Sequence, residues 1–302
     1  MSAPSQSLRQ QISRRSAPLT PPWSEDVREV ERVIYHGDIP VPVYQFRSLA
    51  RFPQLLHGIS TRLGGVSEET HATLNLSFLV GDKPENVRTN RNRLCHTLGC
   101  SHHALITAQQ VHGTTVATLT EEQWLGSDED IDFPAFPATD AIVSTAPGAV
   151  LLVSLADCAS LTLYDPVKRV VGLAHCGWRG TVKGMPRAVV QTMVSVFGCR
   201  PVNIRVGIGP SIGPCCYEVG EEVVQAWHDA QGAEGAPAVL TRTGQRFFDL
   251  WAANRLQLLQ AGITARRIET AALCTACHQE TFFSHRASGG TAGRFAALAG
   301  LR

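Results

Sequence analysis

The sequence predicts a mixed α/β fold of the α+β kind, a single domain in which a mixed β-sheet is flanked by helices. Three observations support this prediction. Hydrophobic residues make up 44% of the 302 residues and charged residues 18%, which is the balance of a folded protein with a large core. Short runs rich in Val, Ile and Leu alternate with helix-like stretches, but in an irregular order. Beyond the N-terminal region, no linker, repeat or low-complexity segment divides the chain.

The first 30 residues are predicted to be a disordered N-terminal tail, and residues 31–302 to be the folded domain. The tail begins with Ser, Gln and Pro around three arginines (Arg9, Arg14 and Arg15), and it has no apolar stretch of the kind found in secretory signals. An Arg- and Ser-rich beginning without acidic residues is also typical of an organelle transit peptide, which stays as the alternative. The acidic, proline-bearing stretch 126–137 is expected to be a surface loop.

Three helices are predicted from apolar residues that recur every three or four positions. The first is expected to be capped by Asp82 and to end at Gly99. The second follows Gly184 with Pro186 in its first turn, and the third ends at Gly262. The apolar stripes of these helices are expected to face the core and to carry no chemistry. They are Val87, Leu94 and Leu98; Met185, Val189, Met193 and Val196; and Phe247, Leu250, Trp251, Asn254 and Leu258.

Buried strands are predicted where short apolar runs are rich in Val, Ile and Leu. No run approaches the roughly 18 uninterrupted apolar residues that a membrane helix requires, so no membrane segment is expected. The predicted strands lie at residues 104–111, 141–145, 150–155, 170–174, 204–208 and 268–273.

Charge and cysteine content restrict the partners and the compartment. The formal net charge is +1, so no overall field attracts nucleic acid or an anionic membrane, and neither is expected as a partner. The nine cysteines are odd in number and form no evenly spaced disulfide framework. This favours a reducing, cytoplasmic compartment, where each cysteine is a core residue, a metal ligand or a nucleophile.

Three predicted strands end in side chains that bind soft or borderline metals. His112, Cys158 and His175 each come just after an apolar run, and they converge if those strand ends lie at one edge of the sheet. Two imidazoles and one thiolate are a common zinc set, and three protein ligands leave the fourth position open. The spacing is not that of a zinc finger, so a buried core histidine or cysteine at each position stays as the alternative.

Two arginines lie beside glycines that let backbone amides approach a ligand. Arg179 stands between a strand end and a helix start in Gly-Trp-Arg-Gly-Thr (177–181), and Arg62 precedes Gly64 and Gly65. A guanidinium in such a loop binds anions readily. The alternative for each is an ordinary surface arginine.

An ordered series of motifs from about residue 50 to the C-terminus resembles the YfiH, or laccase-domain, family of purine nucleoside phosphorylases. The resemblance implies a YfiH-like catalytic α/β domain with a zinc site. Its ligands are the histidine of Gln-Val-His-Gly, the cysteine of Asp-Cys and the histidine before Gly-Trp-Arg-Gly, which are His112, Cys158 and His175 in this sequence. The motifs lie at 57–62, 64–67, 74–76, 81–82, 90–91, 110–113, 139–140, 156–158, 174–180, 208–210, 215–219, 282–286 and 293–294.

The resemblance also implies an activity. The family is associated with phosphorolysis of adenosine, inosine, guanosine and methylthioadenosine, with adenosine deamination, and in some bacterial members with editing of a peptidoglycan precursor. A small purine nucleoside and phosphate are therefore the expected partners, and Zn²⁺ is the expected cofactor. The family's older label is multicopper polyphenol oxidase, but copper is less expected because the sequence contains no His-x-His motif.

Roles within this site follow from the chemistry. Arg62 and Arg179 are expected to hold phosphate, because guanidinium matches its oxygens in a fork. Asp157, next to Cys158, is the candidate acid or base, and its alternative role is to orient the site. The His-x-Glu motif of zinc base deaminases is absent, since His112 is followed by glycine and threonine.

Other cysteines leave two further hypotheses open. The first is an amide hydrolase that edits a peptidoglycan precursor, dependent either on zinc or on Cys158 or Cys176 paired with His175 as a nucleophile. A metal-stabilised binding module without activity is the non-enzymatic hypothesis. Cys176 is also expected to place an extra thiol beside the metal. The Cys-x-x-Cys-His sequence at 274–278 resembles a haem attachment motif, which we interpret as chance.

Overall fold

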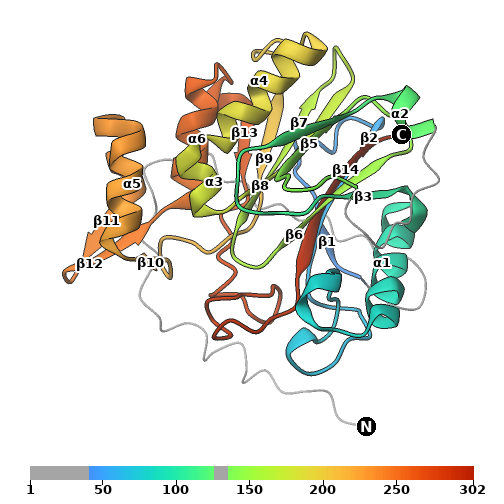
Figure 1. Cartoon of the computed structure of the whole chain (residues 1–302), viewed down its shortest axis with the longest axis horizontal. Coiled ribbons are helices and arrows are strands. Elements are labelled where there is room, and N and C mark those ends of the chain that lie inside the picture. The colour runs from blue at the N-terminus through green and yellow to red at the C-terminus, as the bar shows by residue number, and fades with distance from the viewer. Residues whose placement is uncertain (1–40, 126–134) are drawn as a thin grey trace.

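The computed structural model describes residues 41–125 and 135–302 of the chain (Figure 1). The predicted tail at 1–30, the predicted start of the domain at residue 31 and most of the predicted loop at 126–137 lie outside the described residues.

Two mixed β-sheets form the centre of the molecule, which confirms the α/β class and divides the predicted mixed sheet in two. Three strand pairs are parallel (β4 with β5, β9 with β13, and β3 with β6), and the other pairs are antiparallel. The six-stranded sheet has the order β13 (Ile268–Thr270), β9 (Arg205–Ile208), β7 (Ala159–Asp165), β8 (Val170–Cys176), β5 (Ala141–Ser144), β4 (Val116–Leu119). The five-stranded sheet has the order β1 (Val43–Tyr44), β2 (Leu55–Ser60), β14 (Phe295–Leu301), β6 (Val150–Leu155), β3 (Leu105–Thr107).

Helices cover the outer faces of these two sheets (Figure 1). Three of them, α3 (Trp178–Lys183), α4 (Met185–Phe197) and α6 (Leu250–Gln260), pack on the six-stranded sheet, while α1 (Pro84–Leu98) packs on the five-stranded sheet. A third core lies between the sheets and joins side chains of β5 and β8 to those of β6 and β14. The layers are thus helix, sheet, sheet and helix. The short helix α2 (Glu121–Leu125) lies beyond β4.

A smaller sheet stands at one end of the molecule beside the helix α5 (Glu221–Gln231). Its strands, in order, are β10 (Glu218–Val219), β12 (Gln245–Phe248) and β11 (Val239–Arg242). No helix among the described residues is long and apolar enough to cross a membrane.

The three predicted helices are present, with two corrections at their ends. Gly99 adopts a left-handed conformation just after α1, as expected. Asp82 does not cap α1, because its carboxylate accepts hydrogen bonds from Ser67 and Asn75 instead. Phe247 belongs to β12, and α6 begins only after Asp249, whose side chain accepts a hydrogen bond from the Ala252 amide. The stripe predicted for that helix was therefore too long.

The predicted strands are also present, but the last ends at Thr270 in β13 instead of at residue 273, and the first is shorter than expected as well. It ends at Thr107 in β3, and residues 108–111 continue as a loop. Several strands were not predicted, among them β2, β7 and β14, in which Ser, Thr or Gly interrupts the apolar residues. Among these, β7 is paired on both sides, so its Ser160 and Thr162 are buried in the middle of the sheet.

The connection between β6 and β7 is the feature of the fold that places the chemistry. β6 belongs to the five-stranded sheet and β7 to the six-stranded sheet, so residues 156–158 carry the chain from one sheet to the other. The C-terminal end of β8 and the loop after β3 reach the same region. Side chains from both sheets therefore meet at this crossing.

A buried histidine on β2 makes the fold sensitive to acid. His57 is 1% exposed, and its Nε2 accepts a hydrogen bond of 3.1 Å from the Phe46 amide. Burial lowers the pKa of His57 from 6.5 to about 4. The unfolded chain therefore takes up a proton near pH 6.5, whereas the folded protein does not until about pH 4.

We predict that the titration of His57 lowers the free energy of unfolding by about 3 kcal/mol as the pH falls from 6.5 to 4, since one pKa unit corresponds to about 1.4 kcal/mol. Asp249, whose pKa burial raises to about 6, contributes the opposite slope, so the test is a difference between two proteins. His57→Gln keeps a hydrogen-bond acceptor without the titration. Urea unfolding between pH 7.5 and 4 should show a steeper loss for the wild type. Equal slopes would contradict the assignment.

Candidate metal centre and cavity

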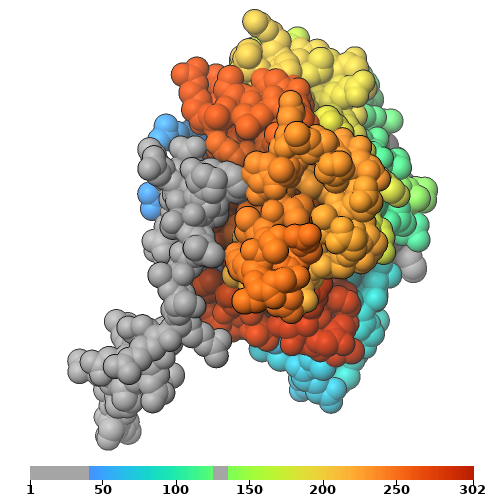
Figure 2. Space-filling model, turned by 90° about the vertical axis from the view of Figure 1, so that its left-hand side faces the viewer, coloured from blue at the N-terminus to red at the C-terminus, as the bar shows by residue number. Residues whose placement is uncertain are grey.

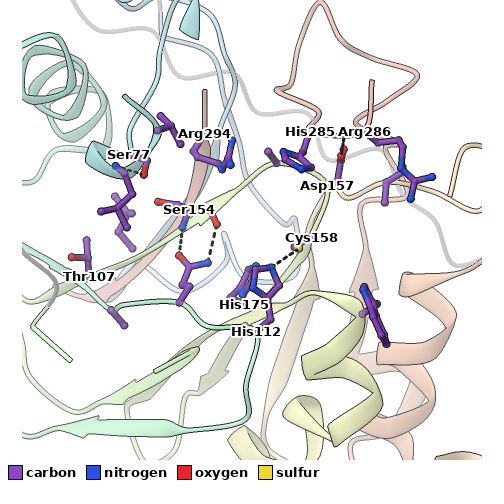
Figure 3. A pocket seen from close by; sticks show the side chains of 18 of the residues that line it. Ser77, Thr107, His112, Ser154, Asp157, Cys158, His175, His285, Arg286 and Arg294 are labelled. Carbon is purple, nitrogen blue, oxygen red and sulfur yellow. Dashed lines mark hydrogen bonds between the residues drawn. The ribbon is translucent and has the colours of Figure 1, made fainter. Parts of the chain in front are cut away.

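Three metal-binding side chains meet where the two sheets join. His112 from the loop after β3, Cys158 from the β6–β7 crossing and His175 from the end of β8 have their ligand atoms within 4.8 Å of one another (Figure 3). His112 Nε2 lies 3.8 Å from Cys158 Sγ. The structure thus brings together the three residues that the strand ends predicted.

A single buried carboxylate holds two of these ligands in place. Asp140, at the start of β5, accepts hydrogen bonds from the backbone amides of Val111, His112 and Gly113 at 2.7–3.1 Å. It also lies 2.9 Å from His175 Nδ1, which leaves Nε2 of that ring free to bind a metal. Carboxylates commonly orient metal-binding histidines in this way. Burial opposes the charge of Asp140, but its hydrogen bonds to His175 and the amides outweigh burial and lower its pKa to about 2.

The same charges prepare the thiol for coordination. Burial disfavours the Cys158 thiolate, yet the neighbouring His175 and His112 outweigh burial and lower the pKa of Cys158 to about 6. Burial likewise disfavours a charged His175, but Cys158 and Asp140 raise the pKa of His175 to about 9. Both pKa shifts have the same direction, because each group favours the charged form of the other: a thiolate at Cys158 and an imidazolium at His175. A bound cation would replace the imidazolium proton as the partner of the thiolate.

The backbone around the trio is strained and closely packed. His112 and Asp157 have φ angles of 60° and 86°, in the left-handed region that non-glycine residues seldom adopt. Such conformations concentrate at functional sites. Gly177 lies directly against the trio, because a Cβ atom at that position would be 2.7 Å from His112 Cδ2 and 2.9 Å from Cys158 Sγ. The first glycine of Gly-Trp-Arg-Gly is thus required by the ligands themselves.

A cavity of about 420 Å³ opens beside the trio (Figure 3). Its volume is within the range of small-molecule sites. The apolar and aromatic part of its lining consists of Phe78, Leu79, Trp178 and Tyr217. Thr107, Ser154 and Asp157 add polar groups, and Arg91, Arg286, Arg294 and His285 add basic ones.

Asp157 lines this cavity, as expected for a candidate acid or base, but both of its oxygens have protein partners. Oδ1 accepts a hydrogen bond from Thr275 Oγ1 at 2.6 Å, and Oδ2 accepts one from the Arg286 amide at 2.7 Å. The carboxylate therefore ties two C-terminal loops to the β6–β7 crossing. These contacts agree with the orienting role that the sequence left open for it.

The two arginines expected to hold phosphate do not line the cavity. The Arg62 guanidinium donates hydrogen bonds to the carbonyl oxygens of Ala72 and Gln279, and it lies over the Phe283 ring. Arg179 is exposed on α3, with its guanidinium carbon 4.4 Å from the centre of the Trp178 ring. Both long side chains turn away from the strand ends that suggested them.

The cavity instead contains basic side chains from the C-terminal part of the chain. Arg294 stands at the start of β14, and Nη1 of its guanidinium bonds the carbonyl oxygens of Ala292 and Gly293. Its Nε and Nη2 have no hydrogen-bond partner within residues 41–125 and 135–302. His285 and Arg286 lie beside Asp157 in Figure 3. Arg286 and Arg294 belong to the motifs at 282–286 and 293–294, but no role was predicted for them, because no local pattern relates them to His112.

The extra thiol of Cys176 does not face the metal ligands. Adjacent residues of a strand point to opposite faces, so Cys176 lies on the other side of β8 from His175. It is fully buried in the core beneath the helices, and burial raises its pKa well above 9. The expectation of a competing ligand at this position was therefore wrong.

Comparison with known proteins identifies the family. Residues 56–302 match the family described as "Multi-copper polyphenol oxidoreductase laccase". The chain is 36% identical over 252 residues to "Purine nucleoside phosphorylase YlmD" of Geobacillus stearothermophilus, covering 83% of this chain and 92% of that protein. It is 35% identical over 241 residues to "Adenosine deaminase RL5" of an unknown prokaryotic organism, covering 79% and 91%.

A solved structure shows the same fold. The YfiH protein of Bacillus licheniformis, described as hypothetical, superposes with a TM-score of 0.80 at 32% identity, covering 87% of this chain and 96% of that one. Sequence and structure agree on one assignment: the chain belongs to the YfiH/YlmD family of laccase-domain proteins.

Proposed function

We propose that the protein is a zinc-dependent purine nucleoside phosphorylase acting on adenosine, inosine, guanosine and methylthioadenosine, with adenosine deamination as a second activity. The observation that carries the proposal is that one cavity is lined both by the metal-binding side chains and by basic side chains. Its volume is large enough for a nucleoside. The relative named purine nucleoside phosphorylase, with 92% of its length covered, supports it.

The donor set fits zinc. One thiolate and two imidazoles suit this ion, and three protein ligands leave one position open, as catalytic zinc sites require. A zinc ion bound there would supply Lewis acidity and fixed positive charge beside the cavity. Copper is less well supported, because His112, Cys158 and His175 are the one histidine-containing group of possible metal ligands among the described residues. Copper is favoured only by the description of the family as multi-copper polyphenol oxidoreductases.

Phosphate is proposed to bind at Arg294, with Arg286 as a second contact. Arg294 is partly buried, and although burial lowers its pKa, the guanidinium stays charged. Its free Nε and Nη2 can form a paired contact with phosphate oxygens. In phosphorolysis, a phosphate oxygen bonds to ribose C1′ while the bond from C1′ to the base nitrogen breaks. The electron pair leaves with the base, which takes up a proton.

The purine is proposed to lie against the aromatic wall, and Asp157 to serve the proton transfer or to orient the loops around it. Trp178 and Tyr217 line the cavity, and aromatic side chains of this kind stack on bases. Among the described residues that line the cavity, Asp157 is the only one with an acidic side chain, and none is a glutamate. Zinc base deaminases use a glutamate for their proton transfers, so deamination is proposed as the lesser activity.

An amide hydrolase that edits a peptidoglycan precursor is the alternative. One observation favours it: the Cys158 thiolate lies beside imidazoles, as in cysteine nucleophiles. A thiolate bound to zinc is a poor free nucleophile, so metal content separates a cysteine hydrolase from the phosphorylase. All nine cysteines are free, which supports the proposal of a reducing, cytoplasmic compartment.

The direct test is adenosine turnover by the purified protein, with and without phosphate. We predict release of adenine that depends on phosphate and yields ribose 1-phosphate in equal amount. Activity should be lost after chelation and restored by zinc. Inosine formed equally fast without phosphate would instead make deamination the main activity, and inert nucleosides would contradict the proposal.

Substitution of Arg294 tests the phosphate site. Arg294→Gln should raise the KM for phosphate by about 10–100-fold, because a hydrogen bond to a charged group contributes about 1.5–3 kcal/mol. The KM for adenosine and the zinc content should change little. Arg187→Gln is the matched control, since Arg187 bonds Gln260 on the helix side of the sheet. Equal effects on both substrates would argue against a phosphate contact.

Substitution of Asp140 tests the support of the metal ligands. Asp140→Asn should weaken zinc binding by about 10–100-fold, as loss of a carboxylate behind a metal-binding histidine typically does. Competition with a zinc chelator measures this affinity. Asp165→Asn is the control, because Asp165 is also buried and accepts hydrogen bonds from backbone amides, but at the far end of β7. If both variants bind zinc like the wild type, Asp140 does not orient the site.

A further inference from the structure

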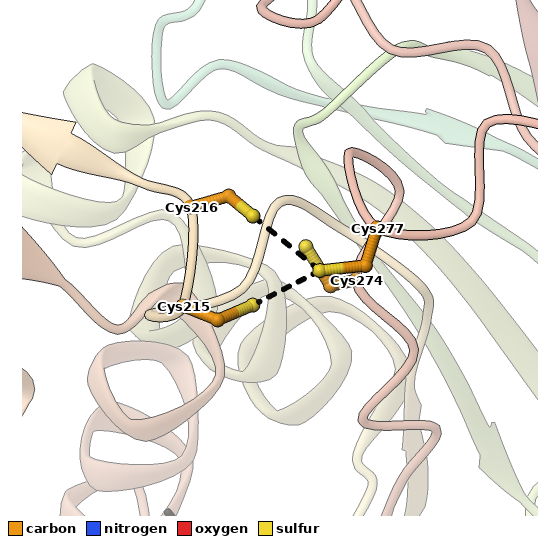
Figure 4. A group of neighbouring side chains, drawn as sticks. All are labelled: Cys215, Cys216, Cys274 and Cys277. Atoms are coloured by element: carbon orange, nitrogen blue, oxygen red, sulfur yellow. Dashed lines mark hydrogen bonds between the residues drawn. The ribbon is translucent and has the colours of Figure 1, made fainter. Parts of the chain in front are cut away.

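Four cysteines form a second cluster outside the cavity (Figure 4). Cys215 and Cys216 lie in the loop between β9 and β10, and Cys274 and Cys277 lie in the loop after β13. All four sulfur atoms are within 4.8 Å of one another. Cys277 Sγ is 3.5 Å from that of Cys215 and 3.4 Å from that of Cys216. None of the four lines the cavity described above.

The spacing of these sulfurs suits coordination of one ion. In a tetrahedral site with Zn–S bonds of about 2.3 Å, every sulfur–sulfur distance is about 3.8 Å. A disulfide would require about 2.05 Å. An iron–sulfur cluster spreads its thiolates over several irons and holds them farther apart than one ion does. The distances of 3.4 and 3.5 Å from Cys277 Sγ lie close to the tetrahedral value, and the remaining pairs lie within 4.8 Å.

The surroundings also resemble those of a metal site. The Gly213 amide donates a hydrogen bond of 3.2 Å to Cys274 Sγ, a contact that stabilises a thiolate. The Thr275 amide donates to the Ser211 carbonyl oxygen at 3.0 Å, so a backbone hydrogen bond already joins the two loops. His278 Nδ1 is 2.9 Å from the Cys274 carbonyl oxygen. The four thiols therefore converge on a supported scaffold rather than on mobile loop tips.

We propose that Cys215, Cys216, Cys274 and Cys277 bind one Zn²⁺ ion in a closed, structural site. Four thiolates fill the tetrahedron and leave no position for water or substrate, unlike the trio at His112. Binding replaces the thiol protons, which are released, and changes no oxidation state. The Cys-x-x-Cys pair that resembles a haem motif thereby acquires a role that involves no haem.

The ion would fasten two loops that form one wall of the cavity. Tyr217, next to Cys216, lines the cavity, and Thr275, between the other two cysteines, donates its hydroxyl hydrogen to Asp157. The Arg286 guanidinium bonds the carbonyl oxygen of Glu218 just beyond Tyr217. On the face in Figure 2, the orange segment around β10–β12 lies beside the dark red C-terminal segment. The second ion would therefore stabilise the arrangement of Asp157 and Arg286.

Metal content of the full chain, purified under reducing conditions, tests this proposal. The wild type should hold two zinc ions per chain, and Cys277→Ser should hold one. Cys100→Ser is the matched control, because Cys100 is partly exposed and belongs to neither group, and it should hold two. His112→Ala should also hold one, which separates this site from the proposed catalytic one. A wild type with a single zinc that His112→Ala abolishes would overturn the proposal.

A second measurement needs no variant and so does not depend on the folding of one. Cys215 and Cys277 are exposed, so as free thiols they should react with iodoacetamide faster than partly buried Cys100. Zinc coordination should instead protect them until a strong chelator is added, with peptide mass spectrometry identifying the modified sites. Rapid modification before chelation, or disulfides among the four in the reduced protein, would contradict a zinc site.

Discussion

The buried carboxylate of Asp140 is the interaction on which the candidate active site depends. It is fully buried, and a buried charge is tolerated only where hydrogen bonds replace water. Three consecutive backbone amides, including that of His112, and the ring of His175 provide them. One group thereby fixes the loop after β3 and the end of β8 at once. Without it, the left-handed backbone of His112 would lose its main restraint.

The two stacked sheets bring the metal ligands and the cavity to one junction. The chain crosses from the five-stranded sheet to the six-stranded sheet through residues 156–158, so Cys158 and Asp157 lie at the junction. The same junction receives His112 from one sheet and His175 from the other. The cavity forms there because residues before β14 and after β9 close it from the side. A site of this kind needs both sheets, and neither alone contains its ligands.

The sequence predicted the positions of short side chains near strand ends, but it did not predict where long side chains point. His112, Cys158 and His175 have short side chains at or just beyond strand ends, so their position followed from the strands. Arg62 and Arg179 have long side chains, and contacts with Ala72, Gln279 and Trp178 direct them away. The four-cysteine cluster was missed for another reason. Its Cys-x-x-Cys half is visible locally, but its partners are brought to it only by the parallel pairing of β9 and β13.

The elements of the fold were likewise predicted where the signal was local, and not where it depended on distant parts of the chain. Strands with uniform apolar residues were recognised, whereas β7 and β14 were missed because pairing on both sides buries their polar or small residues. The helix ends at Gly99 and Gly262 followed from glycine in the left-handed region. Asp82 was misassigned as a cap because its partners, Ser67 and Asn75, come from another part of the chain.

The proposed zinc ion is bound by His112, Cys158 and His175 in the lining of the cavity. Crystals of the protein as purified, measured with X-rays on either side of the zinc absorption edge, test this binding most directly. We expect an anomalous difference peak bonded to all three side chains, with the fourth position directed into the cavity. No peak at that position, in a crystal whose fold matches the one described, would contradict it.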